Sequence, residues 1–453
     1  MIKKMLCFAI TIIGLLSSCG DDPITPPAPT GPQQYGVPFV EVPTTNQATI
    51  YEVNLRAQSS EGNLQGVIAK LQHIKDLGTN VIWLMPIYEQ GVTNSVNSPY
   101  CIKDYTKVSP EYGTLSDLRA LTDQAHALGM AVILDWVANH TSWDHPWINQ
   151  HPEWYSKNSA GQIIIPPGTN WNDVADLNFD QAAMRKAQID AMKYWVLEAN
   201  VDGFRCDYAD GVPFDFWQDA ISDLRALPNR DLLMLAEGTR NDHYQAGFDL
   251  TYGWNYYGAL KNVWTGSSTS TLTTSHQTEF SNITSGKSKI RFTTNHDESA
   301  WDASPMTLFN GKNGAIAASV VNIFSGGVPL LYTGQEVGKT GTTPFFSNST
   351  INWTANQDML AAYQKIYSIY QTNAAARSQT VSAYQLSNDL ICWKKTNGSS
   401  SVLILVNVRN TNISVNLPPI LAGNFINLMT NQAETVGTSL SLTPYAYRIY
   451  SMN

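Results

Sequence analysis

Two charged side chains of opposite sign, Arg205 and Asp207, end a short apolar run at residues 201–207. Side chains alternate faces along a strand, so this spacing places both on one face, next to each other. An adjacent guanidinium keeps a carboxylate ionised and fixes its direction, which suits a nucleophile. An isolated pair of this kind is more often a structural ion pair. The interpretation therefore depends on the residues at the ends of the other apolar runs.

The same kinds of residue come directly after three other short apolar runs. They are Asp135, Asn139 and His140 after one run, Glu237 after a second, and His296 and Asp297 after a third. When parallel strands close into a barrel, the residues at their carboxyl ends face one shared pocket. One such residue has a simple structural explanation. Carboxylates and histidines after four strands predict a catalytic pocket.

Short apolar runs alternate with segments of helical periodicity from residue 48 onward, which is typical of parallel strand–helix units. We predict eight strands, at residues 49–53, 80–86, 131–135, 201–207, 232–237, 248–250, 290–294 and 328–332. The most clearly patterned helices span residues 64–77, 115–128 and 359–370. Eight units in order predict an α/β fold, a (β/α)8 TIM barrel over residues 46–375.

Two regions depart from the barrel pattern. Residues 141–176 are too long for an ordinary loop between a strand and its helix, which predicts a small excursion domain after the third strand. Residues 376–453 change to alternating short strands, which predict a C-terminal antiparallel β-sandwich. The excursion is rich in aromatic residues, namely Trp143, Trp147, Trp154, Tyr155 and Trp171. These rings could line a binding groove or form the core of a small loop-rich domain, and both alternatives stay open.

The composition excludes some classes of partner. The 453-residue chain has a formal net charge of −9 and 14% charged residues, which argues against nucleic acid or an anionic membrane surface as a partner. An apolar content of 43% supports a sizeable core. The chain also contains 13 Trp and 21 Tyr residues, which suits stacking on a neutral, ring-shaped ligand, although most of these rings will pack in cores.

The N-terminus has the pattern of a secretion signal. Lysines precede an apolar run at residues 5–16, which is too short to span a membrane. The sequence LSSC at residues 16–19 resembles the lipobox of bacterial lipoproteins, which implies removal of residues 1–18 and a lipid on Cys19. The acidic residues after it resemble an export tag of Bacteroidetes surface lipoproteins. We therefore expect a lipid anchor in the bacterial outer membrane, at the cell surface, with the periplasmic face or ordinary secretion as alternatives. Residues 19–45 predict a stiff, disordered, Pro/Thr-rich tether.

Five short motifs together resemble those of one enzyme family. They are Asp135-Trp136-Val137-Ala138-Asn139-His140, Gly203-Phe204-Arg205-Cys206-Asp207, Ala236-Glu237, Thr294-Asn295-His296-Asp297 and Asp176-Leu177-Asn178. The first four are similar, in order and strand placement, to the signature regions of the alpha-amylase family of glycoside hydrolases. The last resembles the additional motif before the family's fourth strand. The resemblance spans residues 48–372. It implies cleavage of α-1,4-glucosidic bonds in starch or malto-oligosaccharides with retention, by double displacement.

The resemblance also implies roles for individual residues. Asp207 would be the nucleophile, Glu237 the general acid/base, and Asp297 the carboxylate that stabilises the transition state. The residues implied to bind the sugar or support its subsite are Tyr100, Asp135, His140, Arg205 and His296. Glu237 also lies directly after an apolar strand with no cation beside it in sequence, so we expect a raised pKa.

Two alternatives to hydrolysis stay open. A glucanotransferase acting on the same substrates would use every one of these catalytic residues. A surface lipoprotein that binds starch without cleaving it is the non-enzymatic alternative. Such a protein need not keep Asp207, Glu237 and Asp297, so an enzyme is favoured.

The family resemblance further implies a calcium site with Asn139 and Asp176 as side-chain ligands. Hard oxygen ligands suit Ca²⁺. The sequence departs from the family pattern after the nucleophile, where Asp210-Gly211 takes the place of a Lys-His pair that serves the leaving-group subsites and the calcium site. Bound calcium and a metal-free, hydrogen-bonded loop are therefore both compatible with the sequence. Zinc held by histidines is not favoured, because tight ligand spacing and cysteine partners are absent.

Overall fold

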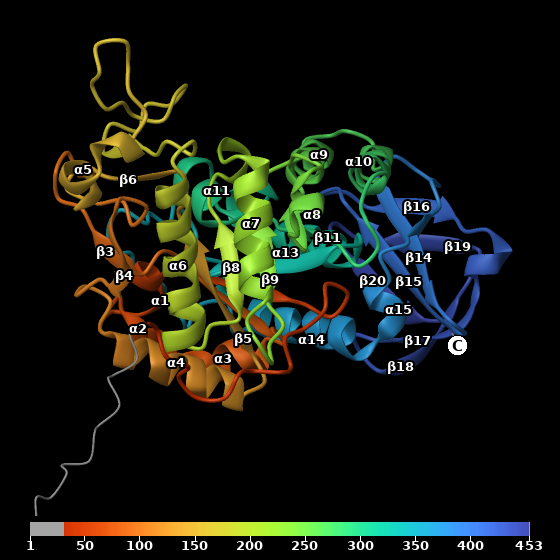
Figure 1. Ribbon diagram of the computed structural model, residues 1–453. Coiled ribbons are helices and arrows are strands. Elements are labelled where there is room, and N and C mark those ends of the chain that lie inside the picture. The colour runs from red at the N-terminus through yellow and green to blue at the C-terminus, as the bar shows by residue number, and fades with distance from the viewer. Residues whose placement is uncertain (1–30, 453) are drawn as a thin grey trace, which may run out of the picture.

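The computed structural model describes residues 31–452, in which eight parallel strands close into a barrel (Figure 1). Each strand pairs with the next in the order β1, β2, β5, β8, β9, β10, β11, β12, and β12 returns to β1. These strands are β1 (Ile50–Val53), β2 (Val81–Leu84), β5 (Ala131–Trp136), β8 (Gly203–Cys206), β9 (Leu233–Ala236), β10 (Leu250–Tyr252), β11 (Ser288–Arg291) and β12 (Val328–Tyr332). The predicted (β/α)8 barrel is confirmed.

Helices surround the barrel (Figure 1). They are α1 (Leu55–Gln58), α2 (Leu64–Ile68), α3 (Leu71–Asp76), α4 (Leu115–Ala127), α6 (Ala182–Glu198), α7 (Phe214–Arg225), α8 (His243–Ala246), α9 (Trp254–Trp264), α10 (Ser270–Phe280), α11 (His296–Trp301), α12 (Pro305–Leu308), α13 (Lys312–Phe324), α14 (Gln357–Thr372) and α15 (Ala374–Arg377), with short 3-10 turns η2 (Ala209–Gly211) and η3 (Gln335–Val337). The helix predicted at residues 64–77 is two helices, α2 and α3. They are separated by a tight turn in which the Lys70 N–H donates to Val67 O at 2.9 Å.

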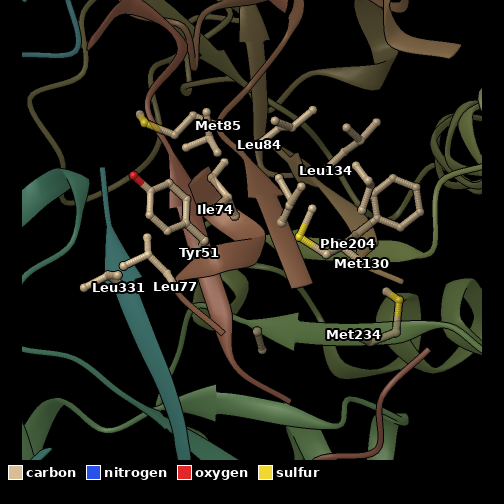
Figure 2. Packing of buried hydrophobic residues seen from close by; sticks show 14 of the residues in the cluster. Tyr51, Ile74, Leu77, Leu84, Met85, Met130, Leu134, Phe204, Met234 and Leu331 are labelled. Atoms are coloured by element: carbon tan, nitrogen blue, oxygen red, sulfur yellow. The ribbon is translucent and has the colours of Figure 1, made fainter. Parts of the chain in front are cut away.

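Side chains of the barrel strands alternate between two cores. Outward-facing residues such as Tyr51 and Leu134 belong to a large cluster with Ile74 of α3 (Figure 2). Inward-facing residues such as Ile50 and Ile133 form a second cluster inside the barrel. Because side chains alternate along a strand, a residue two positions after an inward-facing apolar residue faces the inside as well. Asp135, two residues after Ile133, faces the inside at the carboxyl end of β5 in this way.

The seventh strand differs most from its prediction at residues 290–294. β11 begins at Ser288, two residues earlier, and ends at Arg291. All four of its residues are buried, but three of them are polar or charged, so the apolar run did not mark the strand. Lys289, for example, donates from Nζ to Thr251 Oγ1 at 2.9 Å. The sixth strand lies slightly later than predicted, at β10.

The excursion after β5 projects beyond one end of the barrel (Figure 1). It contains β6 (His140–Ser142), α5 (Trp147–Gln150), η1 (Pro152–Trp154) and β7 (Val174–Asp176), and β6 pairs antiparallel with β7. Trp154 and Tyr155 are buried in a core of its own, against which Trp143 and Trp147 pack. These four rings therefore form the core of the excursion or pack on it, which was one of the two alternatives left open by the sequence. A hairpin of β3 (Tyr88–Gln90) and β4 (Ile102–Val108) was not predicted.

The C-terminal region consists of antiparallel strands beside the barrel (Figure 1). One sheet has the order β13, β14, β15, β20, β17, β18, and a second pairs β16 with β19. The strands are β13 (Ser382–Ala383), β14 (Leu390–Asn397), β15 (Ser400–Asn407), β16 (Ile413–Asn416), β17 (Gly423–Asn427), β18 (Gln432–Val436), β19 (Ser439–Leu442) and β20 (Tyr447–Ser451), with a 3-10 turn η4 (Pro419–Leu421). One face of the large sheet joins the core of the barrel helices, and the other packs with the small sheet.

The described part of the predicted tether, residues 31–45, packs against the barrel. The Tyr35 N–H donates to Leu197 O at 2.8 Å, and the Phe39 ring stacks on His126 with centroids 4.4 Å apart. The prediction of a disordered tether is wrong for this part, because the half-buried side chains of Phe39 and Val42 pack on the barrel and its helices. Val37 and Val40 stay exposed. Val42 packs on the cluster inside the barrel. The predicted signal peptide and Cys19 lie outside the described residues. Within residues 31–452 no helix is long and apolar enough to cross a membrane.

Candidate active site

Arg205 of β8 lies at the centre of the predicted catalytic residues. Its Nη1 donates to Asp135 Oδ1 and to Asp207 Oδ1, each at 2.8 Å. Its Nη2 forms an ion pair with Glu237 Oε1 at 2.9 Å. The guanidinium is fully buried, so water does not screen these contacts. One cation thus joins carboxylates from the carboxyl ends of three different strands.

The backbone around the site fixes where these carboxylates begin. The Asp207 N–H donates to Trp136 O at 2.8 Å, and the Glu237 N–H donates to Cys206 O at 2.9 Å. The pairing of neighbouring parallel strands therefore extends past their ends and orders the first residue of each subsequent loop. Asp207 and Glu237 start from this ordered backbone and converge on Arg205.

Burial dominates the protonation of the carboxyl groups. It raises the pKa of Glu237 to about 7, against the lowering effect of Arg205 and with a further increase from Asp207 and Asp297. It raises the pKa of Asp135 to about 8, again against Arg205. Burial also raises the pKa values of Asp207 and Asp297, which Arg205 partly offsets. Asp135 and Glu237 therefore retain protons near neutral pH that isolated carboxyl groups would lose.

The expected raised pKa of Glu237 is found, although its sequence neighbours do not show the cation that contacts it. A cation does contact Glu237, since Arg205 reaches it from the neighbouring strand. The pKa rises because burial and the two nearby carboxylates outweigh that cation. Sequence adjacency could not reveal a contact made between neighbouring strands of the barrel.

A pocket of about 620 Å³ opens above this cluster. Six of the residues predicted from sequence line it, namely Tyr100, His140, Asp207, Glu237, His296 and Asp297. Asp135 and Arg205 do not line it, because both side chains are fully buried beneath the pocket. They contact the groups that line the pocket instead. Asp135, for example, accepts from Tyr100 Oη at 3.1 Å and from Trp83 Nε1 at 3.2 Å.

His296 is held between a tyrosine and a glutamate. Its Nε2 lies 2.8 Å from Tyr100 Oη, and the two rings stack with centroids 5.5 Å apart. Its Nδ1 lies 2.5 Å from Glu52 Oε1, and Glu52 is fully buried in β1. Sequence reasoning missed Glu52. The available signal was a carboxylate inside the apolar run of the first strand, where an unpaired charge would be costly.

His140 lines the pocket as a neutral imidazole, because burial lowers its pKa to about 4. Its ring meets the edge of Trp171, with centroids 5.5 Å apart. Trp171 lines the pocket as well, unlike the other four aromatic residues of the excursion. Of the two alternatives for the aromatic residues of the excursion, Trp171 therefore fits the one in which a ring lines a binding groove.

Further aromatic side chains line the pocket without having been predicted. They are Tyr208, Trp301, Phe345 and Phe346. Trp301 is 68% exposed and hydrogen-bonds Asp297 from its place four residues later in α11. The rings of Phe345 and His296 lie edge to face, with centroids 5.3 Å apart. Loops at the carboxyl ends of barrel strands form the pocket. The sequence could therefore have indicated these residues only by their positions: Tyr208 follows Asp207, Trp301 follows Asp297, and Phe345 and Phe346 follow β12.

Asn139 and Asp176 lie next to each other at the base of the excursion. The Leu177 N–H donates to Asn139 O at 3.1 Å, and both side chains are buried. Burial raises the pKa of Asp176, a hydrogen bond with Ser156 opposes this, and no cation contributes. A buried carboxylate without a cation and a nearby amide fit the oxygen donors that Ca²⁺ takes. Residues 31–452 contain no cluster of three or more His, Cys, Asp or Glu suited to a metal, so other ligands would be backbone carbonyls or water.

Comparison with known proteins agrees with this geometry. A family model described as the catalytic domain of alpha amylase matches residues 43–162. The crystal structure of an alpha-amylase from Lactobacillus plantarum is 33% identical and covers 90% of this chain and 99% of its own, with a TM-score of 0.82. This chain belongs to the alpha-amylase family. As an alpha-amylase-type protein it is a glycoside hydrolase.

Other relatives of this alpha-amylase family member extend the comparison. Alpha-amylase 3 of Dictyoglomus thermophilum is 28% identical over 374 residues, which are 73% of this chain and 72% of the relative. A maltogenic alpha-amylase of Thermotoga neapolitana, AmyB, shares the fold with a TM-score of 0.80 at 24% identity, over 90% of this chain and 99% of its own.

Proposed function

We propose that this protein hydrolyses α-1,4-glucosidic bonds of starch and malto-oligosaccharides with retention of configuration, through a glycosyl-enzyme on Asp207. The observation that carries the proposal is the pair of contacts from Arg205 to Asp207 and to Glu237. One guanidinium holds both carboxyl groups at the floor of a pocket. Retaining glycosidases need two such groups roughly 5–5.5 Å apart, one for attack and one for proton transfer.

In the first step Glu237 donates a proton to the glycosidic oxygen while Asp207 attacks the anomeric carbon. The pKa of Glu237 at about 7 leaves it largely protonated in mildly acidic solution and about half protonated at neutral pH, as a general acid requires. Asp207 receives a hydrogen bond from Arg205, which favours its ionised form and directs it toward the pocket. Asp297, which lines the same pocket, supplies negative charge to the oxocarbenium-like transition state.

In the second step water takes the place of the departed sugar. Glu237, now a carboxylate, removes a proton from the water, which attacks the anomeric carbon and releases Asp207. Each step inverts the anomeric centre, so the product keeps the original configuration. Tyr100, His140 and His296 line the pocket and would bind the sugar there, with the Tyr100 ring stacked on the sugar and the histidines as its hydrogen-bond partners.

Calcium belongs to the proposal as a structural ion. Asn139 and Asp176 would hold it with backbone carbonyls or water, and it would brace the excursion beside His140. The chemical steps depend on the side chains described above.

A glucanotransferase activity on the same substrates is the second candidate. It is favoured by one observation, the aromatic residues Trp171 and Tyr208 beside Glu237, which could retain a sugar acceptor. A starch-binding protein without activity is less well supported, because the three carboxyl groups that catalysis needs all line the pocket.

Product analysis on maltoheptaose tests the function. Hydrolysis predicts shorter maltodextrins, one new reducing end for each bond cleaved, and initial products in the α configuration by NMR. Transfer predicts products longer than maltoheptaose without a matching gain of reducing ends. Initial β products, or no change in maltoheptaose, would contradict the proposal.

We also propose that Cys19 carries a lipid that anchors the protein to the bacterial outer membrane. The support is the lipobox-like sequence at residues 16–19. Metabolic labelling with a fatty acid should mark the native protein and leave the Cys19→Ser variant unlabelled. Label in both, or in neither, would contradict a lipid on Cys19.

A further inference from the structure

Tyr208, the residue directly after Asp207, has a backbone conformation that tyrosine rarely adopts. Its φ and ψ are both 43°, in the left-handed region. Among the described non-glycine residues with positive φ, seven are asparagine and two are tyrosine. Strain of this kind persists only where surrounding contacts impose it, and it is concentrated at functional sites.

Two contacts with Glu237 accompany this conformation. The Tyr208 N–H donates to Glu237 Oε2 at 2.8 Å, and the Ala209 N–H donates to Glu237 O at 2.9 Å. The strained residue thus provides a backbone donor to the acid/base. Its side chain is half-buried and lines the pocket.

The Asp210-Gly211 departure from the family pattern makes room for the Tyr208 ring. A Cβ on Gly211 would lie 2.2 Å from Cε1 and 2.5 Å from Cδ1 of Tyr208, so any other residue there displaces the ring. Asp210 faces a different loop, accepting from His243 Nε2 at 2.7 Å and from Thr239 N at 3.0 Å. Against burial, these hydrogen bonds lower the pKa of Asp210 to about 2. The ring of Tyr208 is therefore the side chain that this segment presents to the pocket.

Trp171 and Tyr208 meet at a near right angle, with centroids 5.1 Å apart and 77° between the ring planes. We name this pair the aromatic corner. Both rings line the pocket, and the Tyr208 hydroxyl makes no hydrogen bond within residues 31–452. Apolar ring surface and a free hydroxyl together suit a sugar ring, which has apolar faces and a polar rim.

The position of the corner indicates which sugar it binds. The corner lies beside Glu237, whose proton goes to the oxygen of the leaving group. We propose that the aromatic corner binds the sugar on the leaving-group side and holds it as an acceptor, so that it sets the balance between transfer to a sugar and hydrolysis. This inference rests on the proposed function.

The transfer step balances without another reactant. A hydroxyl oxygen of the held sugar attacks the anomeric carbon and forms the new C–O bond. The ester bond to Asp207 breaks, and its electron pair returns to the carboxylate. The hydroxyl proton passes to Glu237. Water takes the same path in hydrolysis, so occupancy of the corner decides which nucleophile reacts.

The test measures partition of the glycosyl-enzyme. Maltotetraose is the donor and maltose the added acceptor, and the readout is the maltose concentration at which transfer equals hydrolysis. Tyr208→Ala should raise that concentration about fivefold to tenfold, the contribution expected of one aromatic contact. Tyr208→Phe keeps the ring and loses only the hydroxyl, so it should raise that concentration by less than Tyr208→Ala does.

Two further variants guard against misfolding and general damage. Gly211→Ala keeps Tyr208 but displaces its ring, so it should change the partition in the same direction as Tyr208→Ala. Phe346→Ala is the matched control. It removes a pocket aromatic that contacts Phe345, on the part of the pocket beside His296, and should change KM without changing the partition.

The outcomes separate the two proposals. Cleavage of maltotetraose with an unchanged partition in both Tyr208→Ala and Gly211→Ala would overturn the aromatic corner while leaving the proposed function intact. Equal shifts in Phe346→Ala and Tyr208→Ala would also overturn it. No cleavage of maltotetraose by the wild-type protein would overturn the proposed function itself, and the corner with it.

Discussion

Glu52 Oε1 lies 2.5 Å from His296 Nδ1, and both side chains are buried. The contact joins the first strand of the barrel to the residue before Asp297. Since Nδ1 faces a carboxylate, it carries the proton, and Nε2 is the nitrogen that faces Tyr100 Oη. Glu52 therefore fixes both the ring orientation and the hydrogen-bonding roles of a pocket histidine.

Replacing Glu52 with glutamine should lower kcat/KM by about tenfold, because a charge-assisted hydrogen bond to His296 becomes a neutral one. Steady-state kinetics on maltoheptaose, with a melting curve to check folding, measure the effect. The Glu52→Asp variant keeps the charge and should recover part of the loss. Wild-type kinetics in a folded Glu52→Gln protein would show that the contact does not position His296.

The Asp207→Asn variant should lose activity by several orders of magnitude while remaining folded, because an amide cannot form the glycosyl ester. Arg205 keeps two of its carboxylate partners, Asp135 and Glu237, so the floor of the pocket should stay ordered. Activity and the melting temperature are measured on the same preparation. Retention of more than a small fraction of wild-type turnover would exclude Asp207 as the nucleophile.

The activity should fall as the pH rises through about 7, the pKa to which burial raises Glu237. The sign is set by its role, since a general acid works in its protonated form and loses its proton above the pKa. A profile of kcat/KM against pH on maltoheptaose tests this. A basic limb centred several pH units away from 7 would contradict the assignment of Glu237.

The same raised pKa values predict how stability changes with pH. Asp135 and Glu237 have pKa values in the folded state well above their ordinary values, at about 8 and about 7. The stability linked to their protonation is present in acid and is lost as the pH rises through those values. Glu237→Gln removes one of these groups, so the melting temperature of the variant minus that of wild type should increase from pH 5 to pH 9. A constant difference across that range would contradict the shift.

Chelation should lower the melting temperature, and added Ca²⁺ should restore it, if Asn139 and Asp176 hold calcium. An ion that binds only the native state stabilises it by about 2.7 kcal/mol at a hundredfold excess over Kd. Asn139→Ala should remove this response to chelator and calcium. A melting curve indifferent to both in the wild-type protein would mean that the two residues form a metal-free loop.

The barrel could be predicted because each strand carries its own local pattern. The seventh strand shows the limit of that pattern, since Lys289 is buried there through a contact with Thr251 that no local rule reveals. The residues of the four motifs at barrel strands come together because they lie at or after the carboxyl ends of those strands, which the fold brings to one end of the barrel.

Contacts between distant residues could not be predicted in the same way. Glu52 and His296 are 244 positions apart, and the sequence offered only a carboxylate within an apolar strand. The local sequence around Tyr208 did not predict that its ring lines the pocket. The ring reaches the pocket because the Tyr208 backbone is left-handed and because Gly211, three residues later, leaves room for it. Function at these positions depends on geometry that the local pattern does not encode.

The packing of residues 31–45 has a consequence for how the protein meets its substrate. Thr45 hydrogen-bonds Gly286 O, just ahead of β11, and Val42 packs at the same end of the barrel, so the described chain enters opposite the pocket. The lipid proposed on Cys19 would therefore attach the protein from the end of the barrel opposite the pocket. The pocket would then face outward, and a long glucan chain could approach it without the bilayer in the way.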